Sequence, residues 1–207
     1  MTMDSWAAPG SVASTRAAGL VLAAGAGRRM GRPKALVRGA DGLPWLAGAV
    51  GLLLAAGCEP VIAVLGAEAA AAIELLPSDP RVRHVIAPDW AEGMGASLRA
   101  GMAELAAVSP HVCDAVVITL VDLPGLRAEV VSRVAAWATP MTIRRAAYDG
   151  VPGHPVVIGR EHWADFAASL AGDEGGKAYL RSHGVELVEC GDLADGRDVD
   201  TAAELLG

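Results

Sequence analysis

The sequence predicts an α/β protein of three layers, in which a mostly parallel sheet is covered by helices on both faces. Apolar runs of strand length alternate along the chain with longer stretches of helical character. The strand-length runs are continuously apolar, which is typical of parallel strands that are buried on both faces. The 207 residues suit one domain, and no linker rich in glycine, serine or proline interrupts them. We therefore expect a single domain over residues 17–207, preceded by a flexible N-terminal extension over residues 1–16.

The individual elements follow from these runs in chain order. The clearest strand is DAVVITLV at 114–121, a continuous apolar run rich in β-branched residues. The predicted strands lie at 19–24, 60–65, 83–87, 114–121, 141–148, 155–158 and 185–189. The predicted helices lie at 44–57, 67–76, from 97 onward, 126–138, twice between 158 and 185, and from 201 onward. Residues 148–155 are rich in glycine and proline, and we expect them to form a turn that projects from the domain.

Composition excludes several classes of protein. A hydrophobic fraction of 53% excludes a disordered chain, and a net charge of −7 disfavours a nucleic-acid partner or an anionic membrane surface. The uncharged stretch at 46–58 is shorter than the ~20 residues that span a bilayer. The apolar run before RRMGRPK resembles a signal peptide, but positive charges on its carboxyl side are the wrong flank for export. Three separated cysteines indicate reduced thiols, so we expect a cytoplasmic protein.

A glycine-rich loop with four positive charges follows the first predicted strand. Glycines expose backbone N–H groups and allow a phosphate to approach closely, and a triphosphate is the natural partner of such concentrated positive charge. A Walker A loop is excluded because Gly31 is followed by Arg-Pro-Lys. A dinucleotide loop is disfavoured because the glycine spacing is GxGxxxG and the second strand ends without an acid. The residues that define the loop are Gly25, Gly27, Arg28, Arg29, Gly31, Arg32 and Lys34.

A single carboxylate follows the clearest strand. Asp122 comes directly after VVITLV, at the strand end where ligands bind in open α/β sheets. Its side chain could cap a helix or could bind Mg²⁺, a hard ion that prefers oxygen ligands. The basic loop at the same edge of the sheet favours the metal.

These residues carry a resemblance to a known family. The segment LAAGAGRRMGRPKAL at 22–36 resembles the signature loop of the nucleotidyltransferases that build molybdenum cofactor dinucleotides. The resemblance implies a Rossmann-like nucleotidyltransferase fold, with Arg29, Lys34 and Asp122 as catalytic residues. Ala24 stands where guanylyltransferases usually carry glycine, so the loop is similar to that of the cytidylyltransferase branch. The loop residues implied to bind the nucleotide are Leu22, Ala23, Ala24, Gly25, Gly27, Arg28, Arg29 and Lys34.

Four weaker elements extend the resemblance over most of the chain. GMGASL resembles the element near the base and ribose, which implies nucleotide contacts for Gly93, Gly95 and Ser97. The element Gly-His154-Pro resembles one on the second-substrate side. The segment at 172–177 is similar to GDxGAR, with Asp173 retained and Lys177 in place of arginine. The segment DVDT implies a metal role for Asp200 and a substrate role for Asp198, with a solvated turn that caps the last helix as the alternative for both.

The resemblance implies a transferase that moves CMP from CTP to the phosphate of molybdenum cofactor and releases pyrophosphate, with Mg²⁺ as cofactor. Its implied partners are CTP, a phosphorylated pterin acceptor and a molybdoenzyme that receives the product. Three alternatives stay open: a transferase that uses GTP or a sugar phosphate, an NAD(P)H-dependent oxidoreductase of the nicotine blue type, and a non-catalytic carrier of the cofactor. The basic loop and Asp122 favour chemistry over a carrier role, because a carrier has no use for a triphosphate site.

Overall fold

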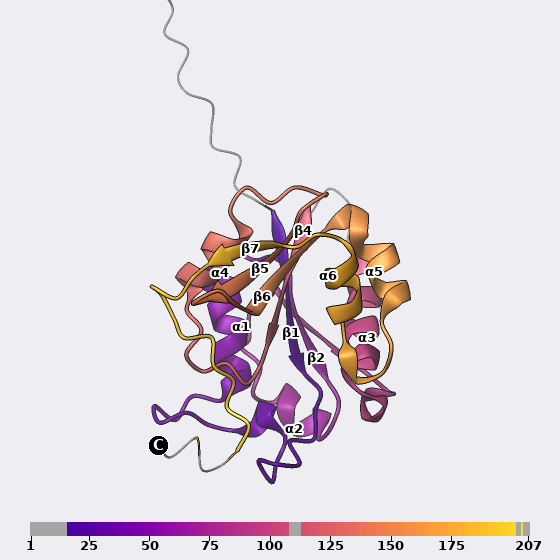
Figure 1. The fold of residues 1–207 in the computed structure, drawn as a ribbon. Helices are drawn as coiled ribbons and strands as arrows, with labels where there is room; N and C mark the ends of the chain where they lie inside the picture. Colours follow the sequence, from indigo (N-terminus) through magenta and orange to yellow (C-terminus); the bar gives the residue numbers. More distant parts are fainter. Residues whose placement is uncertain (1–15, 108–112, 202–203, 205–207) are drawn as a thin grey trace, which may run out of the picture.

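The structure is a computed structural model that describes residues 16–107, 113–201 and 204. In these residues seven strands form one sheet in the order β3-β2-β1-β4-β6-β5-β7 (Figure 1). Only β6 runs against the others, since it is antiparallel to both β4 and β5 while the remaining pairs are parallel. The strands are β1 (Ala17–Ala23), β2 (Val61–Leu65), β3 (Val82–Ile86), β4 (Ala115–Leu120), β5 (Ile143–Tyr148), β6 (Val151–Gly159) and β7 (Glu186–Glu189). The predicted fold class is confirmed.

Helices cover both faces of the sheet (Figure 1). Side chains of α1 and α4 share one buried apolar cluster with alternate residues of β1, β2 and β4, and those of α3, α5 and α6 share a second cluster with the intervening residues. In β1, for example, Val21 belongs to the first cluster, whereas Leu20 and Leu22 belong to the second. Burial on both faces is why these strands are continuously apolar. The helices are α1 (Trp45–Ala55), α2 (Ala69–Ile73), α3 (Met94–Ala106), α4 (Ala128–Ala135), α5 (Trp163–Ser169) and α6 (Lys177–Ser182).

The prediction of a projecting turn at 148–155 is wrong. β5 and β6 form a hairpin in which Tyr148 pairs with Val151, so the loop contains only Asp149 and Gly150. Both loop residues have positive φ, 52° and 77°, as tight two-residue hairpin turns require. Because β6 begins at Val151, His154 lies inside a strand of the sheet instead of at the tip of a loop.

Other boundaries shift by a few residues. Helix α3 begins at Met94, three residues before its predicted start, and the helix predicted over 67–76 is shortened to Ala69–Ile73. The helix predicted from Thr201 falls largely on residues outside the described ranges, as does the extension predicted at 1–16. No helix in the described part of the chain has the length and apolar character that a membrane crossing requires.

Candidate functional site

A cavity of about 570 Å³ lies at the carboxyl ends of β1 and β4. The loop after β1 contributes backbone and cationic side chains, the segment after β4 contributes Asp122, and the N-terminal end of α3 contributes Ser97. Ligands of open α/β sheets bind at this edge, because the connections that leave the strands diverge there. The lining residues are Leu22, Ala23, Ala24, Gly25, Ala26, Gly27, Arg28, Arg29, Lys34, Trp90, Ala91, Gly93, Met94, Ser97, Leu120, Val121, Asp122, Asp173 and Asp200. We call this the nucleotide cavity.

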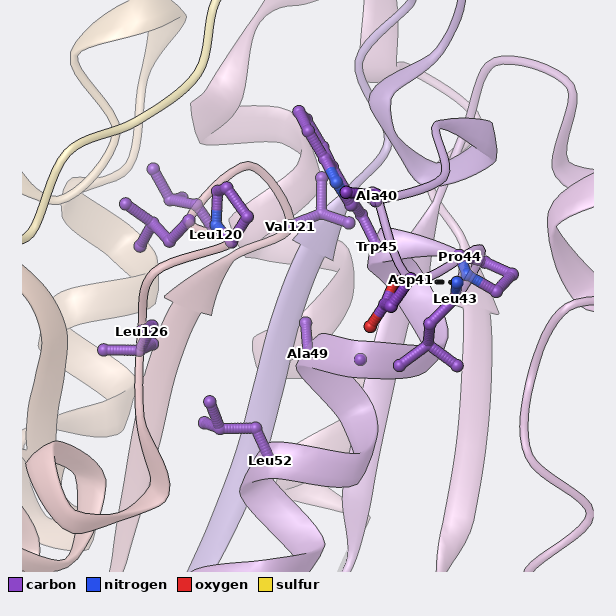
Figure 2. A pocket seen from close by; sticks show the side chains of 14 residues that line it. Ala40, Asp41, Leu43, Pro44, Trp45, Ala49, Leu52, Leu120, Val121 and Leu126 are labelled. Carbon is purple, nitrogen blue, oxygen red and sulfur yellow. Dashed lines mark hydrogen bonds between the residues drawn. The ribbon is translucent and has the colours of Figure 1, made fainter. Parts of the chain in front are cut away.

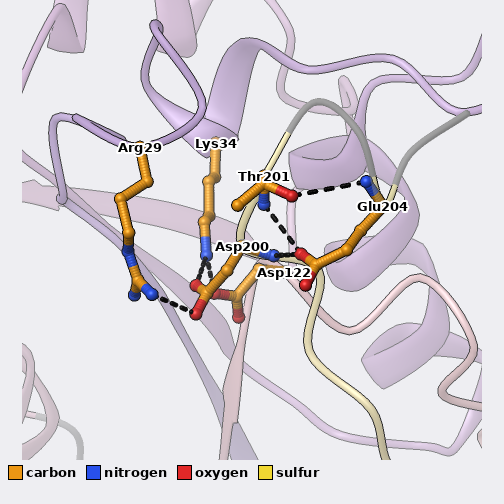
Figure 3. A network of polar contacts seen from close by, with 6 residues as sticks. All are labelled: Arg29, Lys34, Asp122, Asp200, Thr201 and Glu204. Atoms are coloured by element: carbon orange, nitrogen blue, oxygen red, sulfur yellow. Dashed lines mark hydrogen bonds and ion pairs between the residues drawn. The ribbon is translucent and has the colours of Figure 1, made fainter.

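Lys34 is the centre of a charged network in this cavity (Figure 3). Its Nζ lies 2.6 Å from Oδ2 of Asp122 and 2.5 Å from Oδ1 of Asp200, while Nη1 of Arg29 lies 2.8 Å from Oδ2 of Asp200. The side chain of Lys34 is 15% exposed, whereas that of Arg29 is 72% exposed. Asp122 and Asp200 lie 88 and 166 positions from Lys34 in the sequence, yet both contact its ammonium group. Arg29 remains accessible to a ligand.

The pKa shifts in this network follow from these contacts. The hydrogen bond from Lys34 lowers the pKa of the Asp200 carboxyl, and the charges of Lys34 and Arg29 lower it further. Burial alone would lower the pKa of Lys34. Its hydrogen bonds to Asp122 and Asp200, with their negative charges, outweigh burial and raise it. Lys34 and Asp200 therefore stay charged around neutral pH.

The segment that carries Asp198 and Asp200 is anchored beside Asp122. The backbone N–H of Val199 donates to the carbonyl oxygen of Asp122 over 3.0 Å. The carboxylate of Glu204 accepts from the backbone N–H groups of Asp200 and Thr201, at 2.8 and 2.9 Å, and its own N–H donates to the Thr201 hydroxyl (Figure 3). This reciprocal pattern is a capping box, which fixes the backbone of the turn that presents Asp200.

Three carboxylates in this region fit a divalent cation. Asp122, Asp198 and Asp200 each offer an oxygen, and these atoms lie within 4.8 Å of one another. Oδ1 of Asp122 is buried and has no hydrogen-bond partner among the described residues. A buried carboxylate oxygen without a partner is costly unless a ligand satisfies it, and Mg²⁺ and Mn²⁺ prefer such hard oxygen donors.

Glycines in two segments permit close approaches that shape the cavity. Gly27 has a φ of 59°, and a Cβ there would overlap the carbonyl oxygen of Arg32. Gly93 has a φ of 121°, and its Cβ would overlap Oδ1 of Asp173. A Cβ at Gly95 would lie 2.9 Å from the backbone of Ala171. Gly27 and Gly93 line the cavity as predicted, whereas Gly95 lies outside the lining and permits the packing of α3 against the segment before α6.

A second cavity, of about 340 Å³, adjoins the first and shares Leu22, Met94 and Leu120 with it. His154 and Asp198 line this second cavity, which we call the acceptor cavity. Burial, together with the charges of Arg145 and Lys177, lowers the pKa of His154 to about 4. The imidazole is therefore neutral at physiological pH. The substrate role that the resemblance implies for His154 stays a prediction, and the structure places the residue outside the lining of the nucleotide cavity.

Sequence reasoning missed some lining residues. Trp90 and Met94 line the nucleotide cavity, and Arg145 lines the acceptor cavity. An aromatic residue close to a Gly-Met-Gly segment was a usable signal for Trp90, because a large ring beside a glycine-rich loop is suited to stacking. Arg32 belongs to the basic segment but does not line the nucleotide cavity.

A third cavity, of about 430 Å³, lies between α1 and the segment after β4 (Figure 2). Its walls are mainly apolar, as Leu43, Leu52 and Leu126 illustrate. Among the described residues, Asp41 is the only charged one that lines it, and its carboxylate accepts a hydrogen bond from the backbone N–H of Leu43 over 2.9 Å. A cavity without a cation does not fit a triphosphate.

Comparison with known proteins agrees with this geometry. A family described as the MobA-like NTP transferase domain matches residues 19–187. The chain is 36% identical to nicotine blue oxidoreductase of Paenarthrobacter nicotinovorans over 90% of this chain and 93% of that protein. It is 33% identical to molybdenum cofactor guanylyltransferase of Rhodobacter capsulatus over 72% of this chain and 66% of that protein.

Solved structures give the same result. The homologue of Mycobacterium tuberculosis Rv0371c from Mycobacterium sp. strain JC1 matches with a TM-score of 0.78 and 30% identity, over 91% of this chain and 92% of that one. The manganese complex of Rv0371c from M. tuberculosis matches with a TM-score of 0.71 and 28% identity, over 92% and 96%. The family resemblance drawn from the sequence is confirmed, and a divalent metal is known in a structural relative.

Proposed function

Because the chain belongs to the family of MobA-like NTP transferase domains, we propose that it transfers a nucleotidyl group from a nucleoside triphosphate to a phosphorylated acceptor. The observation that carries this proposal is the meeting of Lys34 with Asp122 and Asp200 in a cavity that Arg28 and Arg29 also line. Cations and closely spaced carboxylates in one cavity suit a polyanion that binds together with a metal ion.

The proposed reaction forms one bond and breaks one bond. A phosphate oxygen of the acceptor attacks the α-phosphorus of the nucleotide, and the bond from that phosphorus to the bridging oxygen of the β-phosphate breaks, so that pyrophosphate leaves. A phosphate monoester has a second pKa near ~6, so it is already a dianion at pH 7 and needs no general base. Catalysis then depends on positioning and on stabilising the charge of the leaving group.

The chain's own residues divide this work. The backbone of the loop at Gly25 and Gly27 follows the phosphates, and Arg29 and Lys34 stabilise negative charge on the leaving pyrophosphate. Asp122, Asp198 and Asp200 would hold a divalent cation, for which we propose Mg²⁺. When bound, that cation withdraws charge from the phosphate oxygens. Trp90, Gly93 and Ser97 also line the nucleotide cavity, and we propose that they contact the base and ribose.

For the substrates we propose CTP and the pterin phosphate of molybdenum cofactor. The relative from R. capsulatus is named a molybdenum cofactor guanylyltransferase, which supports the pterin acceptor. Ala24 supports CTP. It is buried, it lines the cavity, and its carbonyl accepts from the N–H of Ala67 over 2.9 Å, so its methyl group occupies space that a glycine would leave to a larger base. We further propose a cytoplasmic protein that passes its product to a molybdoenzyme.

The similarity to nicotine blue oxidoreductase favours a second candidate, the reduction of a pigment by NAD(P)H. The site offers less for that chemistry. β2 ends at the buried Leu65, so the strand supplies no carboxylate for a ribose hydroxyl, whereas the transferase proposal uses the charged groups that are present.

One experiment separates the two candidates. The protein is incubated with molybdenum cofactor, Mg²⁺ and each of the four ribonucleoside triphosphates, and pyrophosphate release is measured. In a parallel assay NADPH oxidation is followed at 340 nm with the pigment. We expect release with CTP above all, abolished in Asp122→Asn and retained in Asp114→Asn, which alters a carboxylate at the opposite end of β4. If none of the four triphosphates gives pyrophosphate release and NADPH is oxidised in the presence of the pigment, the proposal is overturned.

A further inference from the structure

The acceptor cavity combines apolar walls with two cationic side chains. Leu98, Ile118, Phe166 and Leu180 form part of its walls, from α3, β4, α5 and α6. Asp198 lies on its boundary, and one of the carboxylate oxygens of the proposed metal site belongs to that residue. A molecule in this cavity would therefore reach the reacting phosphates while its body remains between the sheet and the helical layer of α3, α5 and α6.

Arg145 enters this cavity from β5 in a fixed orientation. Its Nε and Nη2 both donate to the carbonyl oxygen of Gly153, at 3.1 and 3.0 Å. Among the described residues it forms no ion pair with a carboxylate, and burial lowers the pKa of the guanidinium. A guanidinium taken out of water without a counter-ion is costly, so a site that keeps one in place is suited to an anion that arrives with a ligand.

Lys177 lines the same cavity from the start of α6 and also forms no ion pair with a described carboxylate. The two carboxylates of the cavity have other contacts. Glu174 pairs with Arg181 at 3.1 Å, and Asp198 belongs to the carboxylate cluster with Asp122. The positive charges of Arg145 and Lys177 both act on His154, so the two cations lie around the same imidazole.

We propose that Arg145 and Lys177 bind an anionic group of the acceptor, and that the apolar walls of the cavity hold its uncharged body. The identification of this ligand as the acceptor rests on the proposed function, whereas the anion-binding pair rests only on the cavity and its charges. The triphosphate has its own cations in the neighbouring cavity, so this pair selects the second substrate. Neutral His154 beside the pair can donate or accept one hydrogen bond without adding charge.

Two groups of the acceptor could supply this anion: the phosphate that attacks the nucleotide, or a second anionic group at the other end of the molecule. Two probes distinguish them. A pterin phosphate monoester carries only the phosphate, and molybdenum cofactor carries the oxo-molybdenum group as well. Binding of each probe is measured by quenching of pterin fluorescence or by calorimetry, without nucleotide and without metal, so that no transfer is needed.

The variants are Arg145→Gln and Lys177→Gln, with Lys177→Arg as the conservative change. Arg83→Gln is the matched control, because it removes the same charge from β3 at the opposite edge of the sheet. A hydrogen bond to a charged group is worth about 1.5–3 kcal/mol, so we expect either Gln variant to lose about 10-fold to 100-fold in affinity. Lys177→Arg and Arg83→Gln should bind like the wild type, and an unphosphorylated pterin should bind all five proteins alike.

Each outcome decides the inference. Weaker binding of the pterin monophosphate in the Gln variants assigns the pair to the attacking phosphate, and weaker binding of molybdenum cofactor alone assigns it to the second group. Unchanged affinity for both probes overturns the inference. If Arg145→Gln unfolds, the exposed Lys177→Gln decides alone. If no triphosphate gives pyrophosphate release but probe binding still depends on Arg145 and Lys177, the transferase proposal is overturned and the anion-binding site is retained.

Discussion

Replacing Lys34 by methionine should have opposite effects on metal binding and on catalysis. The ammonium group lies 2.6 Å from Asp122 and 2.5 Å from Asp200, so it pairs with two of the three carboxylates proposed to hold the metal and offsets part of their negative charge. Methionine keeps the length and apolar stem of the side chain but removes the charge. We expect Lys34→Met to bind a divalent cation more tightly without nucleotide, and to lose transferase activity.

The size of the first effect follows from the distances. A cation bound to the same oxygens at about 2.1 Å lies no further than about 4.7 Å from the ammonium, if the lysine stays in place. At that distance the repulsion between the ammonium and a divalent cation is about 1.8 kcal/mol at the dielectric constant of water. It is larger in a part-buried site, where the effective dielectric constant is lower. Lys34→Met should therefore tighten metal binding by about 20-fold or more. Loss of the positive charge at the leaving group should lower the rate about 10²–10³-fold.

Titration with Mn²⁺ checks the metal affinity, because the electron paramagnetic resonance signal of free Mn²⁺ disappears on binding. Arg28→Met is the control, since it removes a charge from the same cavity and forms no ion pair with a described carboxylate. Equal Mn²⁺ affinity in Lys34→Met and the wild type would refute the assignment of these carboxylates to a metal. Full activity in Lys34→Met would refute the role of the ammonium in catalysis.

Three further predictions concern the supports of the site. Gly27→Ala should lower the melting temperature by forcing about 1–3 kcal/mol of strain, whereas Gly25→Ala, whose Cβ meets nothing within 4 Å, should leave it near that of the wild type. Gly196→Ala should reduce activity more than stability, because its Cβ would overlap the ring of Tyr148 and displace the segment with the two carboxylates; circular dichroism should show a retained fold. The pKa of His154, depressed from 6.5 to about 4, adds stability above pH 6.5 that is lost as pH falls toward 4, by less than about 3 kcal/mol because the ring is partly exposed; urea titrations should show a weaker pH dependence in His154→Gln.

The sheet could be predicted from the sequence where burial alone decides the pattern. β1, β2 and β4 lie inside the sheet and not at its edges, are covered on both faces, and therefore read as continuous apolar runs. The hairpin of β5 and β6 could not be predicted, because two prolines lie inside β6. Pro152 and Pro155 precede Val156, where pairing with β4 starts, so the missing N–H of proline breaks no bond to that neighbour.

The residues of the candidate site also differ in how far the sequence alone could predict them. Lys34 and Asp122 were predictable because each belongs to a local motif in the segment that follows a strand, and parallel strands end at a common edge. The position of Asp200 beside Lys34 depends on a hydrogen bond from Val199 to Asp122 and on the packing of Gly196 against Tyr148, which no short segment encodes. Arg145 carries no motif at all. Its significance comes only from the cavity that it enters.

The charges of the two cavities also explain how an acidic chain can bind two anionic substrates. The nucleotide cavity has three cationic side chains, Arg28, Arg29 and Lys34, and three carboxylates, Asp122, Asp173 and Asp200, so its formal charge is zero. A nucleoside triphosphate carries about four negative charges near neutral pH. Such a cavity binds the triphosphate well only when a metal ion accompanies it, so nucleotide and metal should bind with strong mutual dependence. By the same count the acceptor cavity, with Arg145, Lys177, Glu174 and Asp198, also has a formal charge of zero. Its two cations, however, form no ion pair with a described carboxylate, whereas Lys34 and Arg29 are paired with Asp122 and Asp200, so we expect the acceptor cavity to bind its anion without a metal. Removing metal should therefore weaken nucleotide binding far more than acceptor binding, and equal losses measured by calorimetry would contradict this division of charge.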